Sequence, residues 1–251
     1  MTKSSWLGRT ELLLGKDKLQ KLQQAHVLVA GLGGVGAYAA EQLCRAGVGE
    51  MTIIDGDTVE ASNKNRQLPA LDSNIGKEKA EIMATRFRDI NPNIKLHVIN
   101  DFIKDDKMVE ILNQANYDYI VDCIDTLAPK IFLIYLSLEK GFRVASSMGS
   151  GGKLDPTRVE IADISKTYNC KLARMLRKRL HRMGVHKGVK VVFSSEITDP
   201  NAVIIAESQN KKSNVGTISY MPPIFGCMLA SIVIRDLIAD KPLNDVLPVF
   251  E

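Results

Sequence analysis

A glycine-rich turn between a predicted strand and a predicted helix constrains this sequence more than any other feature. Residues 26–47 read HVLVAGLGGVGAYAAEQLCRAG, and Gly31, Gly33 and Gly36 form the pattern G-x-G-x-x-G. Backbone N–H groups in such a turn can approach phosphates closely, and the N-terminus of the following helix adds positive potential. The sequence therefore predicts a strand–turn–helix unit that holds a nucleotide.

The rest of the chain alternates short apolar runs with runs of helical periodicity, which is typical of a parallel sheet covered by helices. The predicted strands are 27–30, 51–54, 96–99, 119–123, 143–147, 159–164 and 190–194, and the predicted helices are 35–46, 76–90, 106–114, 129–140 and 223–239, with a basic helix between the last two strands. We therefore expect an α/β fold, built on a Rossmann-like sheet with helices on both faces. The sheet is expected to be mostly parallel, with antiparallel strands in the C-terminal half.

The length of 251 residues suits one large α/β domain. No internal repeat or low-complexity linker divides the sequence, so we predict a single domain over 1–251. Its parts are an N-terminal helical arm (1–24), a nucleotide-binding half (25–150) and a substrate-facing half (151–251).

Composition excludes several classes of protein. The longest apolar run, 222–234, ends at Arg235 and is shorter than the roughly 20 apolar residues that cross a bilayer, so we predict a buried helix and no membrane partner. No cationic N-terminus precedes an apolar run, so a secretory signal is not expected. The four cysteines are far apart and form no C-x-x-C pair, which favours reduced thiols in a cytoplasmic protein.

The residues downstream of the glycine turn indicate which nucleotide it holds. Asp55 ends the second predicted strand, where an acid can accept a hydrogen bond from a ribose hydroxyl of NAD or of ATP. The segment DGDTVEASNKNRQ (55–67) then supplies an Asn–Arg cluster, which hydride transfer does not need. Lys77 and Lys79 follow, and then the two acids of VDCIDT (121–126). Phosphate transfer needs a Lys for phosphate charge and an Asp for Mg²⁺, so this set favours ATP.

The combination of GLGGVG, IIDGDTVEASNKNRQ, GKEKA and VDCIDT resembles the ubiquitin-activating-like adenylyltransferases, the superfamily that includes MoeB and ThiF. The resemblance covers about residues 5–150 and implies a ThiF/MoeB-type domain that uses ATP with Mg²⁺. The nucleotide-binding residues that it implies are Gly31, Gly33, Gly34, Gly36, Asp55, Asp57, Ser62, Asn63, Arg66, Lys79, Asp125 and Thr126.

The same resemblance implies catalytic roles for four residues. Arg66 and Lys79 contact phosphates, and Asp125 handles the Mg²⁺ that comes with ATP. Arg9, in LGRTELLLG, matches an arginine that such proteins extend across a homodimer interface into the neighbouring site.

The C-terminal half indicates the substrate. The segments GSGGKLDPTRVEIADISKT and NCKLARMLRKRLHRMGVHKGVKVVFSSE are similar to the corresponding segments of the tRNA threonylcarbamoyladenosine dehydratases. Members that activate a sulfur carrier usually bind zinc through two C-x-x-C pairs, and this chain has none. The resemblance implies an ATP-dependent, ligase-type dehydration of threonylcarbamoyladenosine next to the tRNA anticodon, through adenylation of the threonyl carboxylate.

The charge of this region agrees with a tRNA partner. Residues 166–190 hold five Lys, four Arg and no acidic residue, whereas a merely soluble helix tends to mix signs. Leu172, Leu176, Leu180 and Met183 have helical spacing and are expected to face the core. The cations expected to contact tRNA phosphates are Lys171, Arg174, Arg177, Lys178 and Arg182.

Other readings stay open. A protein carrier, either a sulfur carrier or a ubiquitin-like tail, could be adenylated instead, and the glycine turn could belong to an NAD(P)-binding module. Cys170 opens the basic helix, a position that suits a reactive thiol, whereas Cys44, Cys123 and Cys227 are expected in the core. A monovalent cation (K⁺ or Na⁺) and a sulfur-transfer protein also stay open as cofactor and partner. The four histidines show no ligand-like spacing.

Overall fold

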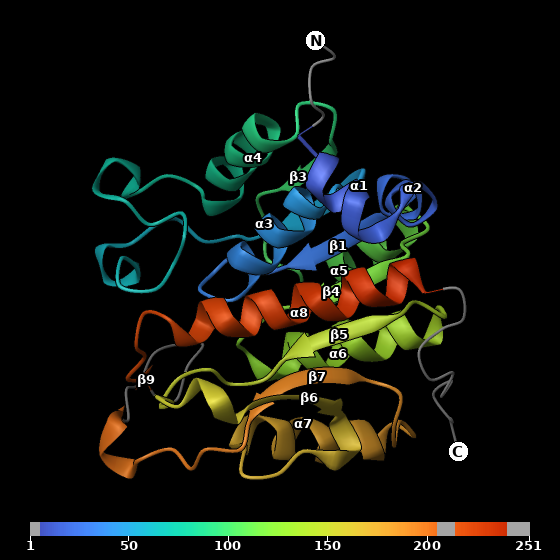
Figure 1. Cartoon of the computed structure of the whole chain (residues 1–251). Coiled ribbons are helices and arrows are strands. Elements are labelled where there is room, and N and C mark those ends of the chain that lie inside the picture. The colour runs from blue at the N-terminus through green and yellow to red at the C-terminus, as the bar shows by residue number, and fades with distance from the viewer. Residues whose placement is uncertain (1–5, 205–213, 240–251) are drawn as a thin grey trace.

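A seven-stranded sheet forms the centre of the molecule in the computed structural model, which describes residues 6–204 and 214–239 (Figure 1). The strand order is β3-β2-β1-β4-β5-β7-β6, and only β6 runs antiparallel, against β7. The strands are β1 (His26–Ala30), β2 (Glu50–Ile54), β3 (Lys95–Ile99), β4 (Tyr119–Asp122), β5 (Val144–Ser147), β6 (Val159–Asp163) and β7 (Lys190–Ser194). β8 (Val203–Ile204) and β9 (Asn214–Val215) form a separate antiparallel pair. The predicted fold class, mostly parallel with antiparallel strands in the C-terminal half, is confirmed.

Helices cover both faces of this sheet. They are α1 (Gly8–Leu14), α2 (Lys16–Gln24), α3 (Gly36–Ala46), α4 (Lys79–Ile90), α5 (Asp105–Gln114), α6 (Leu127–Glu139), α7 (Lys171–Arg182) and α8 (Met221–Ile238). Short 3-10 turns are η1 (Ala61–Asn63), η2 (Asp72–Asn74), η3 (Pro156–Arg158), η4 (Ile164–Lys166) and η5 (Pro200–Ala202). Alternate residues of β1 face opposite sides, so Val27 joins the core under α3, α4 and α8, and Leu28 joins the core under α5, α6 and α7.

Helix α8 is the buried helix that the apolar run predicts. By length and composition it could cross a membrane, but half of it is buried inside the protein. Gly226 lets it approach α3, because a Cβ at this position would lie 2.4 Å from the carbonyl oxygen of Val35. Near its end, Asp236 accepts hydrogen bonds from the Tyr119 hydroxyl (2.8 Å) and from Lys190 Nζ (2.6 Å). These contacts fix α8 across the sheet.

Several predicted boundaries differ from the structure by one to three residues, and the predicted burial of one cysteine is wrong. The helix predicted for 76–90 begins only at Lys79, because Gly76 has a positive φ of 82° and Lys77 accepts a backbone hydrogen bond from Val59 N. Cys227 is exposed, whereas the apolar composition of α8 led us to expect it in the core. Its neighbour Gly226 lies on the side of the helix that packs against α3, and Cys227 points away from that side. Cys44 is buried as expected, and burial raises the pKa of its thiol to about 12. Both ends of the predicted domain, 1–5 and 240–251, lie outside the described residues.

Candidate active site

The predicted nucleotide-binding residues gather at one edge of the sheet. Strands β1, β2, β4 and β5 are parallel, so their carboxyl ends meet at this edge. The glycine turn follows β1, Asp55 follows β2, and Asp125 lies three residues after β4. In open α/β sheets, ligands bind outside the carboxyl ends of the strands, and this edge is therefore the candidate active site.

The glycine turn is closed so tightly that side chains cannot enter it. Gly31 has φ 89°, and a Cβ on Gly36 would lie only 1.7 Å from the carbonyl oxygen of Gly31. No side chain caps the N-terminus of α3, and its first turn holds no acid. The first N–H groups of a helix have no partner within the helix, so they suit an anionic phosphate.

A second loop, 60–67, faces the glycine turn. A Cβ on Gly34 would lie 3.4 Å from the carbonyl oxygen of Arg66, and one on Gly33 would lie 3.7 Å from Gln67 Nε2. Gln67 Oε1 is buried and has no hydrogen-bond partner among the described residues. An orphaned buried acceptor is rare in folded proteins, and one beside the glycine turn fits a site that a nucleotide completes.

Polar contacts within the 60–67 loop hold its arginine in place. Asn63 is buried, and its Oδ1 accepts from Glu60 N (3.1 Å) in a capping box. The Arg66 guanidinium donates to Ser62 O (3.0 Å) and to Asn65 Oδ1 (2.8 Å). The predicted residues Ser62, Asn63 and Arg66 are thus brought together beside the glycines.

Asp55 links the second strand to the glycine turn. Its carboxylate accepts hydrogen bonds from Leu32 N (2.6 Å) and from Asp57 N (2.8 Å). Burial raises the pKa of Asp55, and Lys79 and these two hydrogen bonds oppose the rise. Lys79 is only 4% exposed, and its Nζ lies 2.9 Å from Asp57 Oδ2. A bound phosphate would compete with Asp57 for this ammonium.

The two acids of VDCIDT (121–126), the segment at the end of β4, have different surroundings. Asp122 is fully buried, and its carboxylate accepts from Lys130 Nζ (2.7 Å) and from the Ser146 hydroxyl (2.6 Å). Asp125 is exposed, and Thr126 precedes helix α6. Asp125 is therefore the acid placed to meet a cation from solvent. Lys130 is not among the predicted site residues; its signal in the sequence is a lysine directly before the apolar run IFLIYL (131–136).

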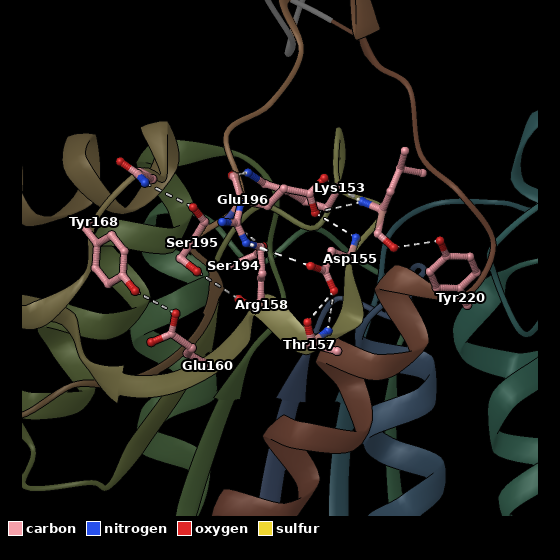
Figure 2. A network of polar contacts seen from close by, with 12 residues as sticks. Lys153, Asp155, Thr157, Arg158, Glu160, Tyr168, Ser194, Ser195, Glu196 and Tyr220 are labelled. Atoms are coloured by element: carbon pink, nitrogen blue, oxygen red, sulfur yellow. Dashed lines mark hydrogen bonds and ion pairs between the residues drawn. The ribbon is translucent and has the colours of Figure 1, made fainter.

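A polar network extends the site beyond β5, and Figure 2 shows it. The Glu196 carboxylate accepts from Leu154 N and Asp155 N, both at 2.9 Å, while Lys153 Nζ donates to the backbone oxygen of Glu196. Lys153 is 4% exposed, and burial lowers the pKa of its ammonium, although Cys170 and Glu196 oppose this. Lys153 is not among the predicted site residues; its signal in the sequence is its place directly after the segment GSGG (149–152).

A hydrogen bond and a close approach, both at Thr217, connect this network with the 60–67 loop. Asn65 Nδ2 donates to Thr217 O (2.9 Å), and a Cβ on Gly151 would lie 3.0 Å from Thr217 Oγ1. The loop that carries Arg66 and the turn that carries Lys153 therefore share residue 217 as a neighbour. The site spans both halves of the chain.

Helix α7 begins at the same edge of the sheet. Just before it, Asn169 Nδ2 donates to Ser195 O (3.1 Å), and the Tyr168 hydroxyl donates to Glu160 (2.9 Å) (Figure 2). Of the α7 residues predicted to contact tRNA, four are exposed: Lys171, Arg174, Lys178 and Arg182. Arg174, Lys178 and Arg182 recur every four residues and form one stripe.

Two cations and a cysteine of this region have structural contacts instead. Arg177 is partly buried and donates to Ile164 O (3.1 Å) and Thr167 O (3.0 Å). Lys190 pairs with Asp236, as described above. Cys170 is 9% exposed and belongs to the core under α7. The sequence could not separate these side chains from their exposed neighbours.

Arg9 lies at the other edge of the sheet. The residue Leu7, two positions earlier, packs on Gly47, where a Cβ would lie 3.0 Å from a Leu7 methyl carbon. Gly47 follows the last residue of α3, whereas the glycine turn precedes its first. An 11-residue helix separates these ends by roughly 16 Å. The structure does not bring Arg9 to the other predicted site residues of the same chain.

Known proteins match the chain along nearly its whole length. Residues 7–248 match the model of the ThiF family. The tRNA threonylcarbamoyladenosine dehydratase of Bacillus subtilis is 36% identical over 95% of this chain and 97% of its own length, and that of Escherichia coli is 41% identical over 75% and 73%. The crystal structure of the Escherichia coli enzyme, TcdA, in complex with ATP has a TM-score of 0.83 at 36% identity, and the match covers 92% of this chain and 93% of that one.

The buried pair beneath the site yields a prediction on stability. Lys130→Met should lower the free energy of unfolding by about 3–5 kcal/mol, because it leaves the Asp122 carboxylate buried without a counter-ion. Urea denaturation followed by circular dichroism measures the loss. The double variant Asp122→Leu/Lys130→Met removes both charges and should recover most of it. A Lys130→Met protein as stable as the parent would contradict the pairing.

Proposed function

The chain belongs to the ThiF family, and we propose that it is an ATP-dependent tRNA threonylcarbamoyladenosine dehydratase that releases AMP and pyrophosphate. The observation that carries the proposal is that one edge of the sheet holds both the glycine turn with the Arg66 loop and the start of the basic helix α7. Relatives named as dehydratases match the C-terminal half as well as the nucleotide-binding half. This joint match supports tRNA over a protein carrier as the substrate.

The proposed reaction has two steps. A carboxylate oxygen of the threonyl group attacks the α-phosphorus of ATP, the α–β phosphoanhydride bond breaks, and pyrophosphate leaves as an acyl-adenylate forms. A nitrogen or oxygen of the neighbouring carbamoyl group then attacks the activated carbonyl carbon and expels AMP. The net change is the loss of water and formation of a ring. The reaction balances without a thiol, a monovalent cation or a sulfur-transfer protein, so the proposal includes none of them.

The protein's part in this reaction is positioning and charge neutralisation. The N–H groups of the glycine turn, with Arg66 and Lys79, would hold the phosphates, and Asp55 would bind the ribose. Asp125 would hold Mg²⁺, which adds positive charge beside the phosphates. The buried ammonium of Lys153 lies on the side of the site nearest α7 and suits a carboxylate substrate. A reaction on tRNA also agrees with a cytoplasmic protein that keeps its cysteines reduced.

We further propose a homodimer in which Arg9 acts in the partner's site. Helix α1, which carries Arg9, has no buried residue, and its Leu12 and Leu13 are 88% and 83% exposed. Adjacent exposed leucines of this kind indicate a contact surface. Because Arg9 and the glycine turn of one chain lie at opposite ends of α3, a second chain is needed to bring them together.

One experiment tests the reaction and its phosphate contacts together. Pyrophosphate release from ATP should require tRNA that carries threonylcarbamoyladenosine. Arg66→Ala should slow this release by about 100-fold or more, because a cation that stabilises developing charge is lost. A coupled phosphate assay under single-turnover conditions measures the rate.

Lys64→Ala is the matched control. Lys64 belongs to the same loop but bonds Asp72 at 2.6 Å, so its removal should leave the rate nearly unchanged. Equal rates for Arg66→Ala and the parent would remove Arg66 from the site. Release that needs a carrier protein rather than the modified tRNA would replace the proposed substrate.

The dimer yields a complementation test. Mixing inactive Arg9→Ala with inactive Asp125→Ala subunits should restore about a quarter of the parent activity, since half of the dimers formed at random are mixed and each has one intact composite site. The control mixes Arg9→Ala with the double variant Arg9→Ala/Asp125→Ala, which leaves every site broken. No recovery in the first mixture, or a monomer by light scattering, would contradict the arrangement.

The stripe on α7 predicts the salt dependence of tRNA binding. Replacing Arg174, Lys178 and Arg182 by Ala should weaken binding and flatten the slope of log affinity against log salt by up to about one unit per lost contact. Filter binding across a salt series measures this. Arg177 is left in place because it holds the turn before α7.

The matched control removes three cations elsewhere, Arg88, Lys104 and Lys107. If both triple variants show the same slope as the parent, α7 does not contact tRNA. If both lose slope equally, the binding reflects overall charge rather than this helix.

A further inference from the structure

A second polar cluster lies at the amino edge of the sheet, opposite the candidate active site. Alternate residues of a strand lie on the same face of the sheet. The face of β1, β2 and β3 that α5 covers is apolar toward the carboxyl ends of the strands, at Leu28, Ala30, Ile54 and Ile99. Toward the amino ends the same face is mostly polar: His26, Glu50 and Lys95 share the first row of the register, and Thr52 and His97 lie in the next row beside Leu28. A change from apolar to polar along one face of three neighbouring strands needs a physical reason.

The register of the strands brings three potential metal ligands together. His26 pairs with Glu50, and His97 lies two residues beyond the partner of Glu50 on β3. Glu50 Oε1 lies 3.5 Å from His26 Nδ1 and 2.8 Å from His97 Nε2. One ligand atom from each residue lies within 4.8 Å of the other two. The spacing of the histidines along the sequence hid this cluster, because only the parallel pairing assembles it.

The contacts behind His26 fix which ring nitrogen faces Glu50. The Tyr117 hydroxyl, on the same side of the sheet, donates to Ile111 O (3.1 Å). His26 Nε2 lies 2.9 Å from Thr52 Oγ1 and forms a hydrogen bond with it. The other ring nitrogen, Nδ1, therefore faces the Glu50 carboxylate. A neutral imidazole whose proton is on Nε2 would offer the lone pair of Nδ1, beside the carboxylate, to a cation placed between them.

We propose that His26, Glu50 and His97 form a binding site for Zn²⁺, with His26 Nδ1, a Glu50 oxygen and His97 Nε2 as ligands. Two imidazoles and one carboxylate suit Zn²⁺ rather than Mg²⁺ or Ca²⁺. The hydrogen bond from His26 to Thr52 is the kind of outer contact that orients a metal-bound histidine. Three protein ligands leave a fourth position for water.

Lys95 competes with the metal for Glu50. Its Nζ lies 2.9 Å from Glu50 Oε1, and its side chain is 68% exposed, so it can swing into solvent when a metal binds. A bound Zn²⁺ would join the amino ends of β1, β2 and the edge strand β3. The site lies at the opposite edge from the glycine turn, so its role is separate from the proposed reaction.

Zinc titration of the full chain tests the proposal. The protein is purified without a histidine tag, stripped with a chelator and titrated with Zn²⁺ against a chromophoric competitor. We expect one tight site per chain. His97→Ala and Glu50→Gln should each weaken it by at least about tenfold, since even outer-shell changes at metal sites cost that much. Lys95→Met should strengthen it, because the competing ammonium is gone.

Two further measurements keep the outcome decisive. The double variant His181→Ala/His186→Ala removes a histidine pair whose ring centroids lie 4.7 Å apart near the end of α7, and it should keep the tight site. Circular dichroism checks that His97→Ala is folded, which its 48% side-chain exposure favours. Unchanged zinc affinity in folded His97→Ala would overturn the proposal. Loss of the tight site in the α7 variant, or no tight site in the parent, would overturn it equally.

Discussion

The closed turn between β1 and α3 is the constraint on which the rest of the candidate site depends. A side chain at Gly36 would overlap the carbonyl oxygen of Gly31, so the turn exists only with glycine at that position. Because the turn is this tight, the first N–H groups of α3 lie directly beyond the sheet edge. Asp55 fastens the turn to the neighbouring strand through Leu32 N, and the Arg66 loop packs on it from outside. The residues proposed to bind phosphate and ribose and to neutralise charge thus share one support.

Much of the fold follows from local patterns in the sequence. Strand and helix positions come from periodicity, and the glycine turn comes from a motif whose geometry leaves few alternatives. The gathering of Asp55 and Asp125 is predictable as well, since carboxyl ends of parallel strands meet at one edge. The antiparallel β6 agrees with the expectation of antiparallel strands in the C-terminal half. These features depend on neighbours along the chain or on general rules of sheet topology.

What the sequence could not reveal depends on which distant side chains meet. Asp122 and Asp125 look alike in VDCIDT, but a lysine on the next helix neutralises the first and leaves the second at the surface. Arg177 differs from its neighbour Lys178 only because a turn accepts its hydrogen bonds. The same limit hid the cluster around Glu50, whose members come from three strands. Tertiary register decides each case, and no single-sequence pattern reports it.

Adenylation of the threonyl carboxylate before ring closure is the central step of the proposed reaction. Isotope transfer tests it most directly. Modified tRNA whose threonyl carboxylate carries oxygen-18 is incubated with ATP and the enzyme, and the released AMP is analysed by mass spectrometry. Attack of the carboxylate on the α-phosphorus predicts AMP that contains one labelled oxygen. Unlabelled AMP accompanying the dehydrated nucleoside would contradict the account.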